Sequence, residues 1–241
     1  MRKNKTDSFV NRFYNKLISP KTIKICGFSI LGLYLGLLFI GVIIAAIFGP
    51  EGYTILTHYI SDLGSLEYTP APYLYDIACI FAGILTIPFT YYLENQIASI
   101  PRNEDLPAPH RWIYRLMSWG YLFSMIGSIF YIGVGIFSAD RDISGMHGIC
   151  SMGAFGGFTF SAIFFGLSII FSYQKIVPKP INYILGFIGI HFPIYIAILN
   201  LIYGGPFLEW LLLFVILAWI LPLNLFTIKY AEKQLLNIQL N

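Results

Sequence analysis

Apolar residues in this chain come in six long runs, separated by shorter stretches in which polar residues, glycine and proline collect. The runs cover about residues 25–48, 73–93, 112–137, 145–173, 181–203 and 207–228. Each run is long enough to cross the hydrocarbon core of a bilayer, which takes about 20 residues of α-helix. The pattern predicts an all-α integral membrane protein: a basic tail at 1–24, a bundle of six transmembrane helices over 25–229, and a C-terminal tail at 230–241.

Composition agrees with this architecture. The chain is 57% hydrophobic and only 11% charged, whereas soluble domains average about 25% charged residues. The run at 25–48 is longer than the 7–15 apolar residues of a signal peptide, so we expect it to stay as the first membrane helix. We expect the basic tail to contact anionic lipids rather than nucleic acid, because a membrane surface lies directly beside it.

The distribution of positive charge predicts the orientation. All of the 15 Lys and Arg residues except Arg141 fall in the N-terminal tail, the connections around 94–115 and 175–179, or the C-terminal tail. Loops rich in Lys and Arg stay in the cytoplasm. Both termini are therefore expected in the cytoplasm and loops 49–72, 138–144 and 204–206 outside, in a multi-pass protein of the plasma membrane.

The first outer loop contains an amphipathic pattern. On a helical wheel, Thr57, His58, Ser61, Asp62 and Ser65 share one side, and the opposite side carries Ile55, Leu56, Tyr59, Ile60, Leu63 and Leu66. Such a separation is typical of a helix with one buried face. We therefore predict a short amphipathic helix in this loop, either lying on the lipid or turning its polar side over the bundle.

Other polar residues are expected on the same side of the membrane. They form, with the loop, a candidate outer polar cluster: His58, Ser61, Asp62, Asp76, Asp140, His147 and Glu209. Ionisable groups at membrane depth are candidates for function, although Asp76 and Glu209 also suit the capping of their own helices. His58 and Asp62 share a helix face, but two ligands are fewer than a zinc site needs. We predict an acidic outer pocket without a metal or cofactor.

Three further features lie inside the predicted helices. His191 is near mid-membrane, two residues before Pro193, and we interpret it first as a buried structural hydrogen bonder and second as a proton-relay residue. Pro88, Pro193 and Pro222 predict kinks. Gly32 with Gly36, and Gly153 with Gly157, recur every four residues and predict close helix packing within the chain, with a homodimer face as the alternative.

Several short motifs together resemble the DUF998 family of membrane proteins, related to the Frag1/DRAM/Sfk1 group. They are Ile60-Ser61-Asp62-Leu63-Gly64, the run from Tyr75 to Leu85, Gly133 to Phe137, Met146-His147-Gly148, and Phe207-Leu208-Glu209 with Trp219. The resemblance implies six helices with Ser61, Asp62, His147 and Glu209 on the outer side, and no settled activity. Two positions depart from the family pattern: Asp76 replaces an Asn, and Trp210 stands where an Arg often follows the Glu.

The expected function is the binding of a lipid headgroup or small cation in the acidic outer pocket, without catalysis. The chain has no Gly-rich phosphate loop, His-Glu-x-x-His stretch or Gly-x-Ser-x-Gly elbow, which are among the most specific enzyme motifs. One alternative is a membrane-embedded hydrolase of the outer leaflet that uses Asp62 or His147, with Ser61 nearby. Another is proton- or cation-coupled transport through Asp62, Glu209 and His191.

Overall fold

The computed structural model describes residues 9–97, 111–171 and 176–239, and the regular elements in these ranges are all helical. Six helices in these ranges are long and apolar enough to span a membrane, which confirms the predicted number. The first spans Pro20–Phe48. The others are α4 (Tyr73–Ile97), α5 (Arg111–Ile136), α6 (Met146–Phe171), α7 (Ile181–Tyr203) and α8 (Pro206–Gln239).

The first membrane helix is continuous but not uniform. It consists of α2 (Pro20–Ser29), a π-helical turn η1 (Ile30–Tyr34) and α3 (Leu35–Phe48). It begins five residues before the predicted run because Ser19 caps it: the Ser19 hydroxyl accepts a hydrogen bond from the Thr22 amide at 3.2 Å, and Pro20 takes the first helical position. A separate nine-residue helix, α1 (Phe9–Leu17), precedes it.

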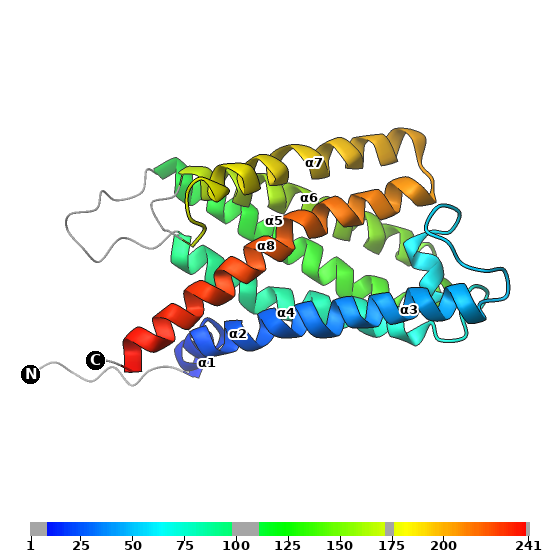
Figure 1. Cartoon of the computed structure of the whole chain (residues 1–241), viewed down its shortest axis with the longest axis horizontal. Helices are drawn as coiled ribbons and strands as arrows, with labels where there is room; N and C mark the ends of the chain where they lie inside the picture. The colour runs from blue at the N-terminus through cyan, green and yellow to red at the C-terminus, as the bar shows by residue number, and fades with distance from the viewer. Residues whose placement is uncertain (1–8, 98–110, 172–175, 240–241) are drawn as a thin grey trace, which may run out of the picture.

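The helices form an up-and-down bundle (Figure 1). Helices α4, α5 and α6 pack side by side, α7 lies on α6 and α8, and α8 packs on α2. The loops after α3, α5 and α7 lie at one end of the bundle, here called the loop end. Helix α1 and the end of α8 lie at the opposite end, the terminal end. Helix α8 crosses α2 near the terminal end and diverges from α3 toward the loop end (Figure 1).

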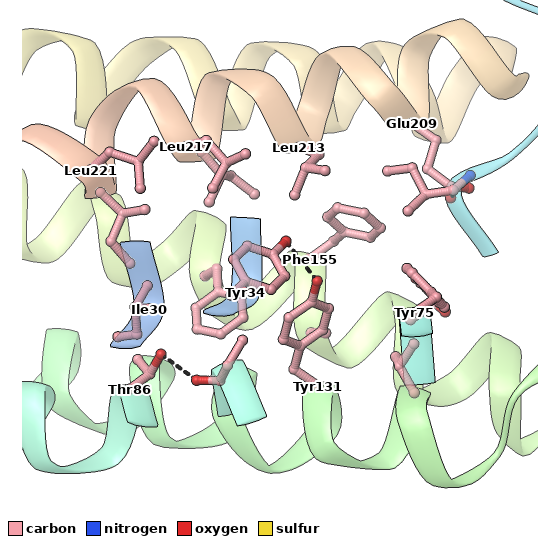
Figure 2. Close-up of a pocket in the computed structure, with 18 residues that line it drawn as sticks. Ile30, Tyr34, Tyr75, Thr86, Tyr131, Phe155, Glu209, Leu213, Leu217 and Leu221 are labelled. Carbon is pink, nitrogen blue, oxygen red and sulfur yellow. Dashed lines mark hydrogen bonds between the residues drawn. The ribbon is translucent and has the colours of Figure 1, made fainter. Parts of the chain in front are cut away.

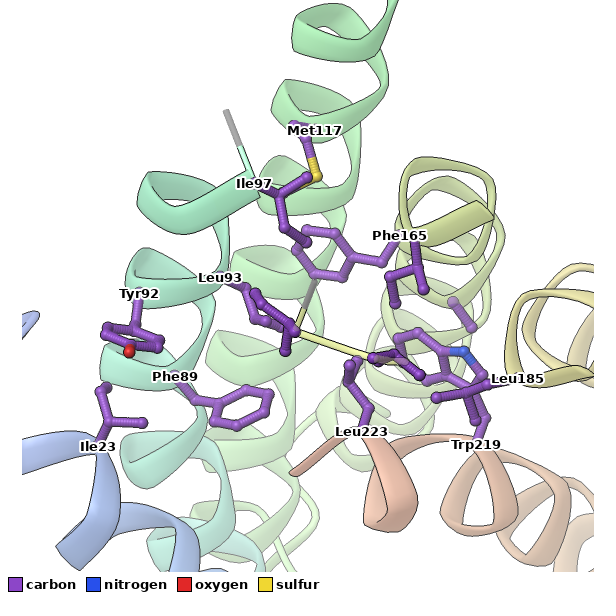
Figure 3. Packing of buried hydrophobic residues seen from close by; sticks show 14 of the residues in the cluster. Ile23, Phe89, Tyr92, Leu93, Ile97, Met117, Phe165, Leu185, Trp219 and Leu223 are labelled. Carbon is purple, nitrogen blue, oxygen red and sulfur yellow. The ribbon is translucent and has the colours of Figure 1, made fainter. Parts of the chain in front are cut away.

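Two buried clusters form most of the interior. The cluster nearer the terminal end includes Tyr92, Leu93, Phe165, Trp219 and Leu223, from α4, α6 and α8 (Figure 3). The second cluster lies toward the loop end and contains Tyr34, Leu63, Tyr75, Val134 and Trp210, among others. The first cluster fills the bundle between its helices, whereas the second surrounds the cavity described below.

Small residues bring α5 and α6 into backbone contact. A Cβ atom added to Gly157 would lie 2.5 Å from the backbone nitrogen of Gly127, and one added to Gly153 would lie 2.5 Å from the ring of Phe130. The prediction of packing within the chain is confirmed for this pair. Gly32 and Gly36 instead have no described atom within 4 Å of such a Cβ, so their strip is open.

Helix α8 extends eleven residues beyond the predicted end at 228. Its last turns pack against the end of α4, where the Tyr92 hydroxyl donates to Gln234 Oε1 at 2.9 Å and Gln234 Nε2 donates to Gln96 Oε1 at 2.9 Å. Ala231 on the same segment is fully buried. These contacts keep helical the residues expected to begin a tail. Residues 172–173 of the predicted fourth helix lie outside the described residues.

The first loop does not form the predicted amphipathic α-helix. It contains turns at Ile55–Thr57 and a five-residue 3₁₀ helix, η2 (Ile60–Gly64). Residues three apart lie above one another in a 3₁₀ helix, and Ile60 and Leu63 are accordingly both buried, at 2% and 1% exposure. Gly64 lies over Tyr75 and Asp76 at the start of α4. The loop therefore packs on the bundle rather than on lipid.

Candidate functional site

Most members of the predicted polar cluster are engaged in local caps at the loop end. Asp62 accepts a hydrogen bond from the Tyr59 amide at 2.7 Å, at the start of its own 3₁₀ helix. Burial raises the pKa of the Asp62 carboxyl above its usual range, and the Tyr59 hydrogen bond opposes that rise. The preceding residue, Ser61, is half-buried, and its backbone amide faces the Glu209 carboxylate. The Asp62 carboxylate thus caps the start of η2.

Asp140 joins two loops. Its carboxylate accepts hydrogen bonds from the Ser65 hydroxyl and the Leu66 amide, both at 2.7 Å. Asp140 lies in the short 3₁₀ helix η3 (Ala139–Arg141), which precedes α6. These two bonds hold the loop after η2 against the loop between α5 and α6, so Asp140 has a structural role in this geometry.

Asp76 pairs with the neighbouring cation. Arg141 donates from Nη2 to Asp76 Oδ2 at 2.6 Å and to the Gly135 carbonyl at 3.2 Å. The Asp76 side chain is 9% exposed and that of Arg141 is 58% exposed. The other oxygen of Asp76, Oδ1, is buried and has no hydrogen-bond partner in the described part of the chain. The single arginine of the loop end thus neutralises its most buried predicted acid.

His58 lies in an aromatic cluster. Its ring stacks on Tyr53 at a centroid distance of 5.1 Å and meets Tyr68 edge-on at 5.4 Å. The indole nitrogen of Trp210 donates to the His58 carbonyl at 3.1 Å, so Trp210 anchors this loop. The residues described contain no group of three His, Cys, Asp or Glu side chains placed to hold a metal.

His147 sits at the start of α6 and its ring faces two groups. Nδ1 lies 2.6 Å from the Phe137 carbonyl, which can only accept, so Nδ1 donates to it, and in the neutral ring Nε2 is then an acceptor. Nε2 lies 3.5 Å from the Ser151 hydroxyl. Asp142 accepts from the His147 amide at 2.9 Å and caps the helix. No described hydrogen bond or ion pair joins His147 to Asp62 or Glu209, although Asp62 interacts electrostatically with each of them.

Glu209 is the predicted acid that lines a cavity. It lies in the first turn of α8, after a turn at Gly204 and Gly205 whose φ angles of 65° and 101° suit glycine. Its Oε1 accepts a hydrogen bond from the Ile60 amide at 3.1 Å. Glu209 was predicted to cap its own helix, but it caps η2 and so fixes that segment over the end of the cavity.

The cavity runs along α8 from the loop end toward the middle of the bundle (Figure 2). It has a volume of about 70 Å³ and is partly open. Glu209, Leu213, Leu217 and Leu221, four residues apart, form one wall, and Thr86 lies opposite at the far end. Since residues four apart share a helix face, this stripe presents one carboxylate followed by three leucines.

Two tyrosines that sequence reasoning missed lie in the middle of the cavity. The hydroxyls of Tyr34 and Tyr131 are 2.8 Å apart, and their rings meet edge-on at a centroid distance of 6.0 Å (Figure 2). Both tyrosines stand well inside apolar runs instead of at their ends, where tyrosine normally lies at the membrane interface. That position was the available signal that they line an internal site.

Helix irregularities flank the cavity. The π-helical turn η1 contributes Ile30 and Tyr34, Thr86 lies two residues before Pro88, and Leu221 immediately precedes Pro222. π-turns occur frequently at functional sites, and broken helices often surround cavities in membrane proteins. These irregularities of three helices therefore lie beside the cavity.

His191 lies apart from this site. It was predicted to be buried near the carbonyl freed by Pro193, but it is exposed on α7. Its ring stacks on Phe187 at 4.3 Å, and its Nδ1 lies 3.0 Å from the Phe187 carbonyl, one turn earlier in the same helix. The His191 ring thus has a hydrogen-bond partner within its own helix, and it makes no described contact with the cavity.

Comparisons with known proteins give a family and no activity. A family model described as a protein of unknown function (DUF998) matches residues 35–224. No curated protein and no solved structure matches the chain. The matched segment begins at α3 and ends within α8, so it includes η2, Asp62, His147 and Glu209. The chain belongs to the DUF998 family.

Proposed function

We propose that this protein binds a membrane lipid, with an acyl chain in the cavity beneath α8 and the headgroup at Glu209. The observation that carries the proposal is the lining of the cavity: it is apolar along most of its length and has one carboxylate at the loop end. We further propose the orientation given by the charge distribution, with both termini in the cytoplasm of a plasma-membrane protein. Glu209 then lies at the level of the outer headgroups.

The dimensions and chemistry of the cavity favour an amphiphile. Its volume of about 70 Å³ exceeds several-fold the 10–15 Å³ that one water needs, which suffices for a segment of hydrocarbon chain. Leucine, isoleucine and phenylalanine side chains prefer such a chain to water. The carboxylate favours a headgroup with a positive charge or hydrogen-bond donors. A small cation alone would meet few ligands here, since the Tyr34 and Tyr131 hydroxyls bond each other.

The resemblance to the Frag1/DRAM/Sfk1 group agrees with this proposal, because the resemblance implies a lipid-associated or regulatory membrane protein.

A homodimer is a separate proposal. The open strip at Gly32 and Gly36 lies on the first membrane helix and does not line the cavity. If the protein forms a homodimer, this strip is the better candidate of the two predicted faces, since Gly153 and Gly157 already contact α5. Lipid binding does not depend on such a dimer.

The test of the proposal is the lipid that purifies with the protein. Leu217→Trp places a large ring in the cavity. Leu225→Trp makes the same change on an outward position of α8 that is 46% exposed, and so serves as its matched control. Lipids extracted from each purified variant are quantified by mass spectrometry. We expect the wild type and Leu225→Trp to retain a common lipid at close to one per chain, and Leu217→Trp to lose it.

The headgroup is tested separately at Glu209. Glu209→Gln keeps an oxygen that accepts from Ile60 but removes the charge. The control, Asp140→Asn, removes the charge of a capping acid outside the cavity lining and keeps one oxygen that accepts from Leu66. We expect Glu209→Gln to retain a lipid but to lose its preference for headgroups that carry an amine. Equal lipid content in the two Trp variants, or unchanged headgroup preference in Glu209→Gln, contradicts the proposal.

A second candidate function is hydrolysis of an ester in the bound lipid, and the Ser151–His147 pair is the observation that favours it. Ser151 lines the cavity, and the proton on His147 Nδ1 leaves Nε2 able to accept from the Ser151 hydroxyl. In such a reaction Ser151 Oγ bonds to the ester carbonyl carbon, its proton passes through His147 to the departing alkoxide, and water later releases the acid. In this reaction Ser151 and His147 take the roles that were predicted for Ser61 and Asp62.

Labelling with a fluorophosphonate, which reacts with activated serines, distinguishes the two candidates. Lipid binding alone predicts that the wild type is not labelled. Labelling of the wild type that disappears in both Ser151→Ala and His147→Ala favours hydrolysis. The transport alternative gains no support from the described residues, because His191 lies on the surface of α7 and makes no described contact with the cavity.

A further inference from the structure

We infer that the terminal end of the bundle carries a second lipid site, for an anionic phospholipid, formed by α2 and the end of α8, with α1 beside α2. This inference is independent of the proposed cavity site, which lies toward the loop end. Its first observation is α1, a nine-residue helix whose apolar side chains are uncovered. Phe9, Val10 and Phe13 are 76%, 69% and 59% exposed. Exposed aromatic residues at the end of a membrane bundle are stable when they enter the lipid interface.

The position of α1 is fixed by contacts on its other side. The ring of Tyr14 meets that of Tyr91 on α4 edge-on at a centroid distance of 5.8 Å. At the connection to α2, the Thr22 hydroxyl donates to the Lys16 carbonyl at 2.7 Å and lies 2.8 Å from the Ser19 hydroxyl. Helix α1 is thus attached to the bundle through Tyr14 and its connection to α2, while its apolar side chains remain exposed.

The second observation is a groove between α2 and α8. It has a volume of about 630 Å³ and is lined by Lys21, Lys24, Ile25, Phe28, Ser29 and Leu235. Ile25 and Phe28 are 57% and 51% exposed. The groove therefore combines two ammonium groups and a serine hydroxyl with an apolar strip that continues along the membrane helix. A phosphate next to an acyl chain has the complementary chemistry.

Charge at this end favours an anionic occupant. Lys24 forms an ion pair with Glu232 at 2.8 Å, whereas Lys21 is exposed at the edge of the groove. Arg12 and Lys16 on α1 are exposed as well. Anionic membrane surfaces attract such basic segments, and the groove is a defined site at which an anionic headgroup can bind. The structure assigns this groove to a diacyl phospholipid with a net negative headgroup.

The test compares phosphatidylglycerol with phosphatidylcholine. The full chain in mild detergent is titrated with each lipid, and bound lipid is counted by native mass spectrometry. The variant Lys16→Gln/Lys21→Gln removes one charge that lines the groove and one on the neighbouring helix α1. Its matched control, Lys229→Gln/Lys233→Gln, removes two exposed charges of α8 that do not line the groove. Both variants carry the Leu217→Trp substitution, so that the cavity lipid is absent from the count.

We expect phosphatidylglycerol to bind more tightly than phosphatidylcholine, and the site variant to lose about 25-fold in phosphatidylglycerol affinity, from roughly fivefold for each basic residue at an anionic surface. The control variant should lose less than twofold. Equal losses in the two variants would show a general charge effect and overturn the site. Competition by millimolar inorganic phosphate would also overturn it, since that result needs no acyl chain. An unchanged melting temperature confirms that the variants are folded.

Discussion

Replacing Gly157 by alanine puts a methyl group where α5 and α6 are in backbone contact. The new Cβ would lie 2.5 Å from the nitrogen of Gly127, 2.6 Å from its Cα and 2.9 Å from the Phe123 carbonyl oxygen. All three are backbone atoms of the neighbouring helix, so no flexible side chain can move aside. The two helices must separate, and packing along their contact is lost.

The adjacent residue provides the control. Gly156 lies on the same helix, and a Cβ added there has no described atom within 4 Å. Both substitutions gain the helix preference of alanine over glycine, up to about 1 kcal/mol, so the comparison cancels that gain. Overpacking typically costs about 1–3 kcal/mol. We therefore expect Gly157→Ala to be less stable than Gly156→Ala by about that amount.

Thermal unfolding of the two purified variants in the same detergent measures the difference. For a chain of 150–250 residues, 1 kcal/mol corresponds to about 2–4 °C in Tm. Gly157→Ala should thus melt roughly 2–12 °C below Gly156→Ala. A Tm for Gly157→Ala equal to or above that of Gly156→Ala would refute the close approach of α5 and α6.

Two further predictions concern the surroundings of the cavity. Tyr34→Phe removes the 2.8 Å hydrogen bond to Tyr131 and should lower the free energy of unfolding by about 0.5–1.5 kcal/mol. Adding Tyr131→Phe should lower it little further. If the Tm losses of the two single variants instead add up in the double variant, the hydrogen bond does not contribute to stability. Arg141→Gln leaves the 9% exposed Asp76 carboxylate without its cation and should lower the free energy of unfolding by about 1–3 kcal/mol. Adding Asp76→Asn should restore part of the Tm. An unchanged Tm in the double variant would argue against the ion pair.

The number of membrane helices could be predicted because it depends on local sequence. An apolar run long enough to span the bilayer has to become a helix, since lipid satisfies no backbone hydrogen bonds. The longer end of α8 depends instead on a contact with a distant helix, through the hydrogen bonds between Gln234, Tyr92 and Gln96.

The candidate site was harder to predict. The acids of the loop end were expected to share one pocket because they lie on one side of the membrane. What the sequence could not show is how each acid is held: the Asp62 carboxylate accepts from the Tyr59 amide, and the Asp140 carboxylate accepts from the Ser65 hydroxyl and the Leu66 amide. The amphipathic wheel of the first loop failed for a related reason, because Glu209 holds Ile60, 149 residues away in the chain, and imposes a shorter helix.

The cavity depends on features that periodicity does not reveal. The π-helical turn at Ile30–Tyr34 adds residues to one turn and changes which side chains face inward. The divergence of α8 from α3 (Figure 1) likewise follows from packing at the terminal end. Tyr34 and Tyr131 meet across 97 residues of sequence, and only the folded bundle brings them together.

The central claim is that an acyl chain lies along α8 beneath Glu209. The most direct measurement uses a phospholipid with a photoactivatable diazirine at mid-chain, reconstituted with the full protein, illuminated, and mapped by peptide mass spectrometry. We expect adducts on cavity residues such as Leu213, Leu217 or Phe155, and their disappearance in Leu217→Trp. Adducts confined to outward residues such as Phe39 and Leu201, which are 67% and 79% exposed, would contradict the claim.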